Sequence, residues 1–238
     1  MPDVTEIWSY LAQGPLLWLT LTLVAYGAAD ALAQAAHRAP LANPVLISVI
    51  LLAAMLWLTQ TPYETYFEGA QFVHFLLGPA TVSLAVPLYL QGARLKSALL
   101  PVLAALLVGS LVAIASALMI ARALGVSSDT LAALAPKSTT APVAIGIAQS
   151  LGGSPTLAAV LVILTGITGA LIATPLLNLL RIGDWRARGL SVGVAAHGIG
   201  TARAFQVHPT AGAFAGIGMG LNAILTALIA PAVLRLFV

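Results

Sequence analysis

Apolar segments of about 20 residues follow one another along almost the whole chain, and they constrain its fold more than any other feature. A helix needs about 20 apolar residues to cross the hydrocarbon core of a bilayer. Such segments occupy residues 15–36, 43–61, 69–92, 97–121, 128–151, 156–180, 189–206 and 210–237. Only 7% of the 238 residues are charged, against about 25% in a soluble domain. The sequence therefore predicts an all-α polytopic membrane protein with one domain over residues 1–238.

Several functional classes are excluded by what the sequence lacks. It has no cysteine, so disulfides and cysteine metal sites are impossible. The net charge of +3 is spread over short loops without a basic run, so we expect no nucleic acid partner. No nucleophile elbow, metal-ligand cluster or phosphate-binding loop occurs. We expect no enzyme activity, no cofactor and no metal.

Three of the apolar segments are interrupted. The breaks lie at residues 78–83 in the third segment, 136–142 in the fifth and 197–201 in the seventh, and each contains glycine or proline. Proline removes a backbone donor and glycine loosens a helix. Backbone groups freed at membrane depth are tolerated only inside protein or beside water. The sequence therefore predicts that the functional site lies at these breaks.

The distribution of charge predicts how the segments are oriented. Basic residues follow the first and third segments, at Arg38, Arg94 and Lys96, whereas Glu64 and Glu68 lie between the second and third. Cytoplasmic loops carry an excess of Lys and Arg. These loops therefore predict that the N-terminus lies outside a bacterial inner membrane. The first ten residues contain no Lys or Arg and so lack the basic start of a signal peptide, and we expect the first segment to stay in the mature protein.

The strongest basic cluster decides how segment 128–151 is placed. Residues 181–188 contain three arginines, and they would face outside if segment 128–151 crossed the membrane. The conflict disappears if that segment is a re-entrant hairpin from the outer face. The prediction is then about seven spans plus one hairpin, with the C-terminus in the cytoplasm.

The same topology makes two groups of three segments inverted copies. Residues 43–121 form the first repeat and residues 156–237 the second, and the middle member of each is a broken helix. Gly78 and Thr81 in one break correspond to Gly198 and Thr201 in the other, 120 residues later. Inverted repeats with paired broken helices are typical of transporters. The sequence predicts that the two broken helices cross at the midplane.

Two cations are candidates for binding an anion. Arg203 lies in a very apolar segment, where a guanidinium costs roughly 2.5 kcal/mol or more. It is either a carboxylate clamp or an interfacial arginine that extends to water. Lys137 lies between Pro136 and Pro142, beside Ser138 and Thr139. It either lines an anion path or is an exposed loop lysine.

The remaining candidates belong to the breaks and to the last segment. Half-helix N-termini offer free N–H groups, and we expect substrate binding from Thr81, Ser83, Gly198, Gly200, Thr201 and Asn222. The hydroxyls could instead bond to the preceding turn. His197 is either a proton carrier or a neutral histidine bonded to a carbonyl. A separate set, Gly212, Gly216 and Gly220, forms a ridge for helix packing.

Four stretches resemble the LrgB/CidB family of bacterial membrane proteins. They are GPATVSLAVPLY at 78–89, APKSTTAPVA at 135–144, AAHGIGTARA at 195–204 and MGLNAILTAL at 219–228. The resemblance covers about residues 60–237. It implies transport of small 2-hydroxy or 2-oxo monocarboxylates such as glycolate, glycerate, lactate or pyruvate, because the family includes the membrane half of the plastid glycolate/glycerate transporter.

The resemblance also implies an alternative function. The family was named for antiholin-like control of murein hydrolases and cell lysis, and its bacterial members work beside a small LrgA/CidA-type protein. Our first hypothesis is a secondary transporter of a small anionic substrate, with proton coupling through His197 as an addition. The alternative is a holin-like modulator of lysis. In either case we expect a lipid bilayer environment and a homo-oligomer such as a dimer.

Overall fold

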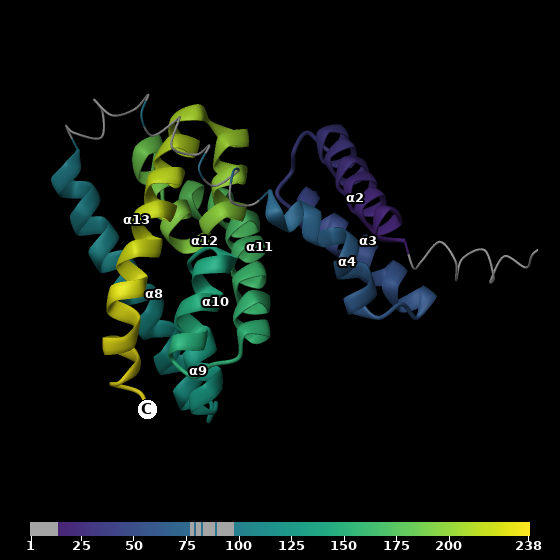
Figure 1. Cartoon of the computed structure of the whole chain (residues 1–238). Helices are drawn as coiled ribbons and strands as arrows, with labels where there is room; N and C mark the ends of the chain where they lie inside the picture. Colours follow the sequence, from purple (N-terminus) through teal and green to yellow (C-terminus); the bar gives the residue numbers. More distant parts are fainter. Residues whose placement is uncertain (1–13, 77–78, 80–81, 83–88, 90–97) are drawn as a thin grey trace, which may run out of the picture. The chain divides into compact units, whose positions relative to one another are not determined.

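The computed structural model of the chain describes residues 14–76, 79, 82, 89 and 98–238 (Figure 1). Within these residues the regular structure is helical and no strand occurs, which confirms the predicted all-α class. The chain divides into two compact units, one within residues 1–83 and the other within 84–238. Gly78, Thr81 and Ser83 lie outside the described residues.

The first unit contains α2 (Pro15–Ala35), α3 (Pro44–Thr59) and α4 (Tyr63–Phe75). Helix α4 packs closely on α2 at Gly69, which has no side chain: a Cβ added there would lie 2.1 Å from the Pro15 carbonyl oxygen. The Tyr66 ring and the buried Trp18 ring pack in a T-shaped arrangement, with their centroids 5.9 Å apart. Asn43 caps α3 by accepting from the backbone N–H of residue 45 at 2.9 Å.

The second unit contains the remaining described helices. They are α8 (Leu99–Ala123), α9 (Ser128–Leu134), α10 (Ala141–Ser150), α11 (Pro155–Leu179), α12 (Trp185–Val207) and α13 (Pro209–Leu234). Among the described residues, α2, α8, α11 and α13 are long and apolar enough to cross a membrane. Proline in the first turn starts α2, α3, α10, α11 and α13. Proline is tolerated in the first turn because the N–H that it lacks would have no intrahelical acceptor there.

Helix α12 doubles back on itself. His197 has φ 41° and ψ −134° inside it, and the Trp185 ring at its start stacks on His208, just beyond its end, at 4.7 Å. Twenty-three continuous helical residues would separate those ends by about 34 Å. The chain therefore enters along residues 185–196, reverses at His197 and returns along 198–207. The predicted crossing at 189–206 is wrong, because hydropathy records the length of a segment and not a reversal within it.

Apolar contacts define the two ends of the second unit. The start of α8 packs with the starts of α12 and α13, through Val102, Leu190 and Phe214. The last turns of α8 pack with the last turns of α13, through Leu118 and Leu234. Helices α8 and α13 thus run in the same direction, from what we call the Trp185 end to the Leu234 end.

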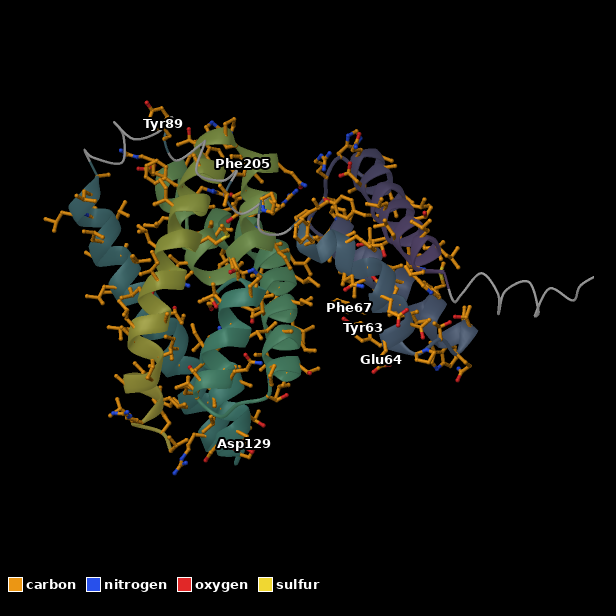
Figure 2. The ribbon with its side chains drawn as sticks, in the orientation of Figure 1. Tyr63, Glu64, Phe67, Tyr89, Asp129 and Phe205 are labelled. Carbon is orange, nitrogen blue, oxygen red and sulfur yellow. The ribbon has the colours of Figure 1, made fainter. Side chains whose placement is uncertain are left out.

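Helices α9 and α10 form a second hairpin, which enters from the Leu234 end. Leu131 of α9 and Ile147 of α10 belong to the same buried cluster as Leu234. A Cβ at Gly153, just after α10, would lie 2.6 Å from the Ala133 backbone nitrogen, so the chain returns to where it entered. Figure 2 shows Asp129 of α9 and Phe205 of α12 toward opposite ends of this unit. A helical hairpin is thus present at the predicted 128–151.

The hairpin in α12 changes the predicted topology and repeat. Helix α8 with the α9–α10 hairpin, and α11 with α12, each give a long helix followed by a hairpin, and the two hairpins enter from opposite ends. The predicted second repeat of three crossings, 156–237, is therefore not confirmed, because residues 185–207 form a hairpin. Arg186 lies at the Trp185 end and Arg235 at the Leu234 end. These two residues therefore lie at opposite ends of the unit, and the predicted cytoplasmic side for the 181–188 cluster and for the C-terminus cannot both hold. Which end faces the cytoplasm stays a prediction.

Candidate functional site: two hairpin tips inside the bundle

The two hairpins meet at their tips, which are residues 135–140 of the α9–α10 turn and residues 197–198 of α12. Asn222 of α13 lies between them. Its Nδ2 donates to the Ser138 carbonyl oxygen at 3.0 Å and to the Val194 carbonyl oxygen at 3.2 Å. Its Oδ1 accepts from the Ser110 hydroxyl of α8 at 2.5 Å. Figure 1 shows α10 between α9 and α12, beside α13. Asn222 is only 1% exposed.

His197 fixes the tip of α12 by a hydrogen bond to α11. Its Nε2 lies 2.8 Å from the Val162 carbonyl oxygen. A carbonyl only accepts, so Nε2 carries the proton in this arrangement. A Cβ at Gly166 would lie 2.6 Å from the His197 ring, so glycine at this position lets the imidazole reach the carbonyl one turn earlier. This is the carbonyl-bonded arrangement foreseen as the alternative for His197, and its proton-coupling role stays a prediction.

The hydroxyl groups of both tips bond to their own backbone. The Thr201 hydroxyl donates to the His197 carbonyl oxygen at 2.7 Å, and the Thr139 hydroxyl donates to the Pro136 carbonyl oxygen at 2.9 Å. Both side chains are buried. They stabilise the reversals, because the carbonyls at a helix break lack their usual partners.

Lys137 and Ser138 stand at the tip of the α9–α10 hairpin. Lys137 is half-buried, and its Nζ donates to the Ser138 hydroxyl at 3.2 Å. Helix α10 begins at Ala141, directly after this turn. The second half of α12 begins at Gly198, where a Cβ would meet only the Met219 sulfur, at 3.8 Å. A cation and two half-helix N-termini, which favour negative charge, therefore lie at the tips.

Arg203 is not part of the tips. It lies six residues beyond His197, about 9 Å along the returning half of α12, and is half-buried. It lines a cavity of about 20 Å³ with Thr174, Trp185 and Arg188, and donates to Gln206 Oε1 at 3.4 Å. The structure therefore brings Lys137 and Ser138 to Asn222 and His197, and it places Arg203 toward the Trp185 end.

Arg188, which the sequence identified only as one of three arginines in a basic cluster, is buried. Arg188 donates to the Ile182 carbonyl oxygen at 2.9 Å and to Asn178 Oδ1 at 2.8 Å, and its guanidinium lies 4.9 Å from the centre of the Trp185 ring. Trp185 in turn stacks on His208, whose Nδ1 accepts from the Thr210 N–H and caps α13. These contacts close the open end of the α12 hairpin. An arginine and an aromatic residue three apart were the sequence signal for this contact.

Asp184 caps α12 at the same end. Its carboxylate accepts from the Arg186 backbone N–H at 2.8 Å and pairs with the Arg186 guanidinium at 2.6 Å. These hydrogen bonds lower the pKa of Asp184 to about 2. Both residues of the ion pair line a mostly apolar cavity of about 540 Å³ between α8 and α12.

The predicted glycine ridge of α13 makes only part of its contacts within the described residues. A Cβ at Gly212 would lie 2.2 Å from the Phe205 ring, whereas one at Gly216 or Gly220 would meet nothing within 4 Å. Gly189 and Gly193 of α12 make the close approach instead, since a Cβ at either would lie about 2 Å from a carbonyl oxygen of α13. Packing through Gly216 and Gly220 stays a prediction.

Comparisons with known proteins agree with the resemblance seen in the sequence. The LrgB-like family matches residues 22–236. YxaC of Bacillus subtilis is 37% identical over 198 residues, which are 83% of this chain and 86% of YxaC. The holin-like protein CidB of Staphylococcus epidermidis is 33% identical over 225 residues, 93% of this chain and 96% of CidB. No solved structure matches the chain.

Proposed function

Since the chain belongs to the LrgB-like family, we propose that it acts as a holin-like protein of a bacterial membrane. The relative CidB is described as a holin-like protein, and this chain aligns with 96% of its length. Four long apolar helices among the described residues suit an integral membrane protein. The proposed partner is a small LrgA/CidA-type membrane protein. With this partner, the chain would modulate murein hydrolase activity and cell lysis.

A single structural observation supports a permeation role within this function. Two polar hairpin tips meet inside an apolar bundle, at Asn222. Polar backbone at membrane depth is stable only where protein or water surrounds it. Opening this junction would join the two ends of the bundle through polar groups, and the holin-like effect is then a change in solute permeability.

The test is co-expression in a bacterium that lacks its own members of the family. The chain and a small LrgA/CidA-type protein, induced together, should change the rate of lysis and the murein hydrolase activity released. Either protein alone should do less. An unrelated polytopic membrane protein at the same level is the control for overloading the membrane. Lysis equal to that control in all combinations contradicts the proposal.

A second candidate, transport of small monocarboxylates, is favoured by the charges at the tips. Lys137 and the starts of α10 and of the second half of α12 provide positive potential at the junction. A 2-hydroxy or 2-oxo acid such as lactate, glycolate, glycerate or pyruvate would bind there by its carboxylate. His197 is the candidate for proton coupling, because its ring lies at the same junction.

Uptake into liposomes that hold only the purified chain tests this second candidate. Radiolabelled pyruvate or lactate should exchange with unlabelled acid inside, and succinate should compete poorly because it carries a second charge. Empty liposomes and liposomes that hold an unrelated membrane protein are the controls. Uptake no faster than in these controls would leave only the holin-like function.

A further inference from the structure

All the hydrogen-bonding capacity of Asn222 is used. An amide side chain has two N–H donors and an oxygen with two lone pairs. Both donors go to carbonyls, of Ser138 and Val194. The oxygen accepts from Ser110 at 2.5 Å and from Thr226 at 3.4 Å. Nothing remains to bind a substrate, so the predicted substrate-binding role does not suit Asn222 in this state.

The two carbonyls that Asn222 holds belong to the two breaks. Val194 is among the last four residues of the entering half of α12, whose carbonyls lose their helical partners at His197. Ser138 lies in the turn between α9 and α10. Each carbonyl therefore gains a partner from the same amide group, 28 and 84 residues away along the chain.

The oxygen side of the amide bonds to the long helices α8 and α13. Ser110 is in the middle of α8 and Thr226 is one turn beyond Asn222 in α13, and both are at most 2% exposed. These two hydroxyls fix the direction in which Nδ2 points. The amide oxygen thus bonds to side chains of the long helices α8 and α13, and the amide nitrogen bonds to the backbone of the two hairpins.

We propose that Asn222 is a positioning residue that ties the two hairpin tips to each other and to α13, and that the tips separate when its two N–H bonds are released. This inference deepens the permeation role and rests on it for its purpose, because the junction is where a solute would pass. The tie itself is a property of the folded chain that can be measured without any transport or lysis.

Cysteine reactivity tests the tie, since the chain has no native cysteine. Ser138→Cys places a thiol at a position that is 5% exposed, and Ala230→Cys places one at a position that is 0% exposed in α13, near the Leu234 end. Each is combined with Asn222→Asp, which keeps the side-chain size and the oxygen but loses the two N–H donors. Reaction with a small charged thiol reagent is followed in the purified protein.

Loss of two hydrogen bonds should speed the reaction at Ser138→Cys by about tenfold or more, with the reaction at Ala230→Cys unchanged. The matched control is Ser110→Ala, which removes one of the two bonds to the amide oxygen but keeps the bond from Thr226 and both N–H donors, so it should change the Ser138→Cys rate less than threefold. An unchanged rate at Ser138→Cys in Asn222→Asp overturns the proposal. Equal acceleration at Ala230→Cys also overturns it, because that is general loosening.

A second measurement needs no variant at residue 222. Hydrogen exchange in the unmodified chain should show one common opening free energy for the amides of residues 137–141 and 197–200, because one residue holds both tips. Different opening free energies for the two tips would overturn the tie even if Asn222→Asp does not purify. Failure of uptake or lysis assays alone would instead count against the proposed function.

Discussion

At the scale of single residues, His197 carries an unusual backbone. Its φ of 41° lies in the region that favours glycine, yet the side chain is needed to bond the Val162 carbonyl. A non-glycine residue in such a conformation costs about 1–3 kcal/mol and persists only where its surroundings hold it. The reversal of α12 therefore depends on a side chain that offsets the strain of its own backbone.

Two substitutions at His197 separate these effects. Both His197→Ala and His197→Gly lose the bond to Val162, but only alanine keeps a Cβ at positive φ. We expect His197→Gly to be more stable than His197→Ala by about 1 kcal/mol, measured as thermal unfolding of the purified protein. Equal stability, or a more stable alanine variant, would show that His197 is not strained.

The structure changes which cation is the main candidate for binding an anion, from Arg203 to Lys137. Lys137 is at the junction, whereas Arg203 reaches Gln206 on the returning half of α12. We expect Lys137→Ala to weaken monocarboxylate binding about ten- to hundredfold, by loss of one charge-assisted contact. Arg203→Lys should stay within threefold. The measurement is substrate affinity in detergent, and the reverse order would restore the clamp at Arg203.

How far the sequence could predict the site differs from residue to residue. The stretches around Lys137 and His197 were identified because proline, glycine and polar residues interrupt apolar segments. The hydrogen-bond partners of His197 and Asn222 could not be identified from the sequence, since Val162 lies 35 residues from His197 and Ser110 lies 112 residues from Asn222. Arg203 drew attention through its charge, although its surroundings could be known only from the packing.

At the scale of elements, glycines decide how closely α12 approaches α13. A Cβ at Gly193 would lie 2.0 Å from the Ala215 carbonyl oxygen, and backbone cannot move aside as a side chain can. The limits of α2, α11 and α13 were predicted within a few residues because apolar length and an initial proline suffice for them, whereas the predicted segment 69–92 lies mostly outside the described residues. The contacts between helices were not predicted, because a glycine repeat in α13 and a glycine pair in α12 look equally suited to packing in a sequence.

A matched pair of substitutions tests which glycines pack. Gly193→Ala should destabilise the protein by about 1–3 kcal/mol through overpacking. Gly216→Ala meets no described atom within 4 Å and should be neutral or stabilise by up to about 1 kcal/mol. Thermal unfolding and the oligomeric state are measured together. A Gly216→Ala variant that folds normally but loses self-association would instead support the predicted ridge as an interface between copies.

At the scale of the whole molecule, the direction of each helix follows from where the hairpins reverse. The predicted crossings counted the segment at 189–206 as one passage, and the reversal at His197 removes that passage. Helix α13 then leaves from the Trp185 end and finishes at the Leu234 end. Charge still orients the bundle, because Arg181, Arg186 and Arg188 lie together at or near the Trp185 end, which we expect in the cytoplasm.

Labelling from the two sides of the membrane tests this orientation. Single cysteines at Gly183 and at Leu236, both in exposed positions beyond helix ends, should be modified by an impermeant reagent from opposite sides. Helix α13 has 26 residues and is about 39 Å long, so it is long enough to separate them across a bilayer. We expect Gly183→Cys to react only in inverted vesicles and Leu236→Cys only in intact cells.

The control for that experiment is a cysteine that both arrangements place alike. Ser154→Cys, at the start of α11, lies at the Leu234 end with the α9–α10 hairpin, and it should react from the outside whether or not α12 crosses. If Leu236→Cys reacted from the cytoplasm while Ser154→Cys reacted from outside, residues 185–207 would have to cross the membrane. That pattern would contradict the hairpin, since the stacking of Trp185 on His208 requires both ends of α12 on one side.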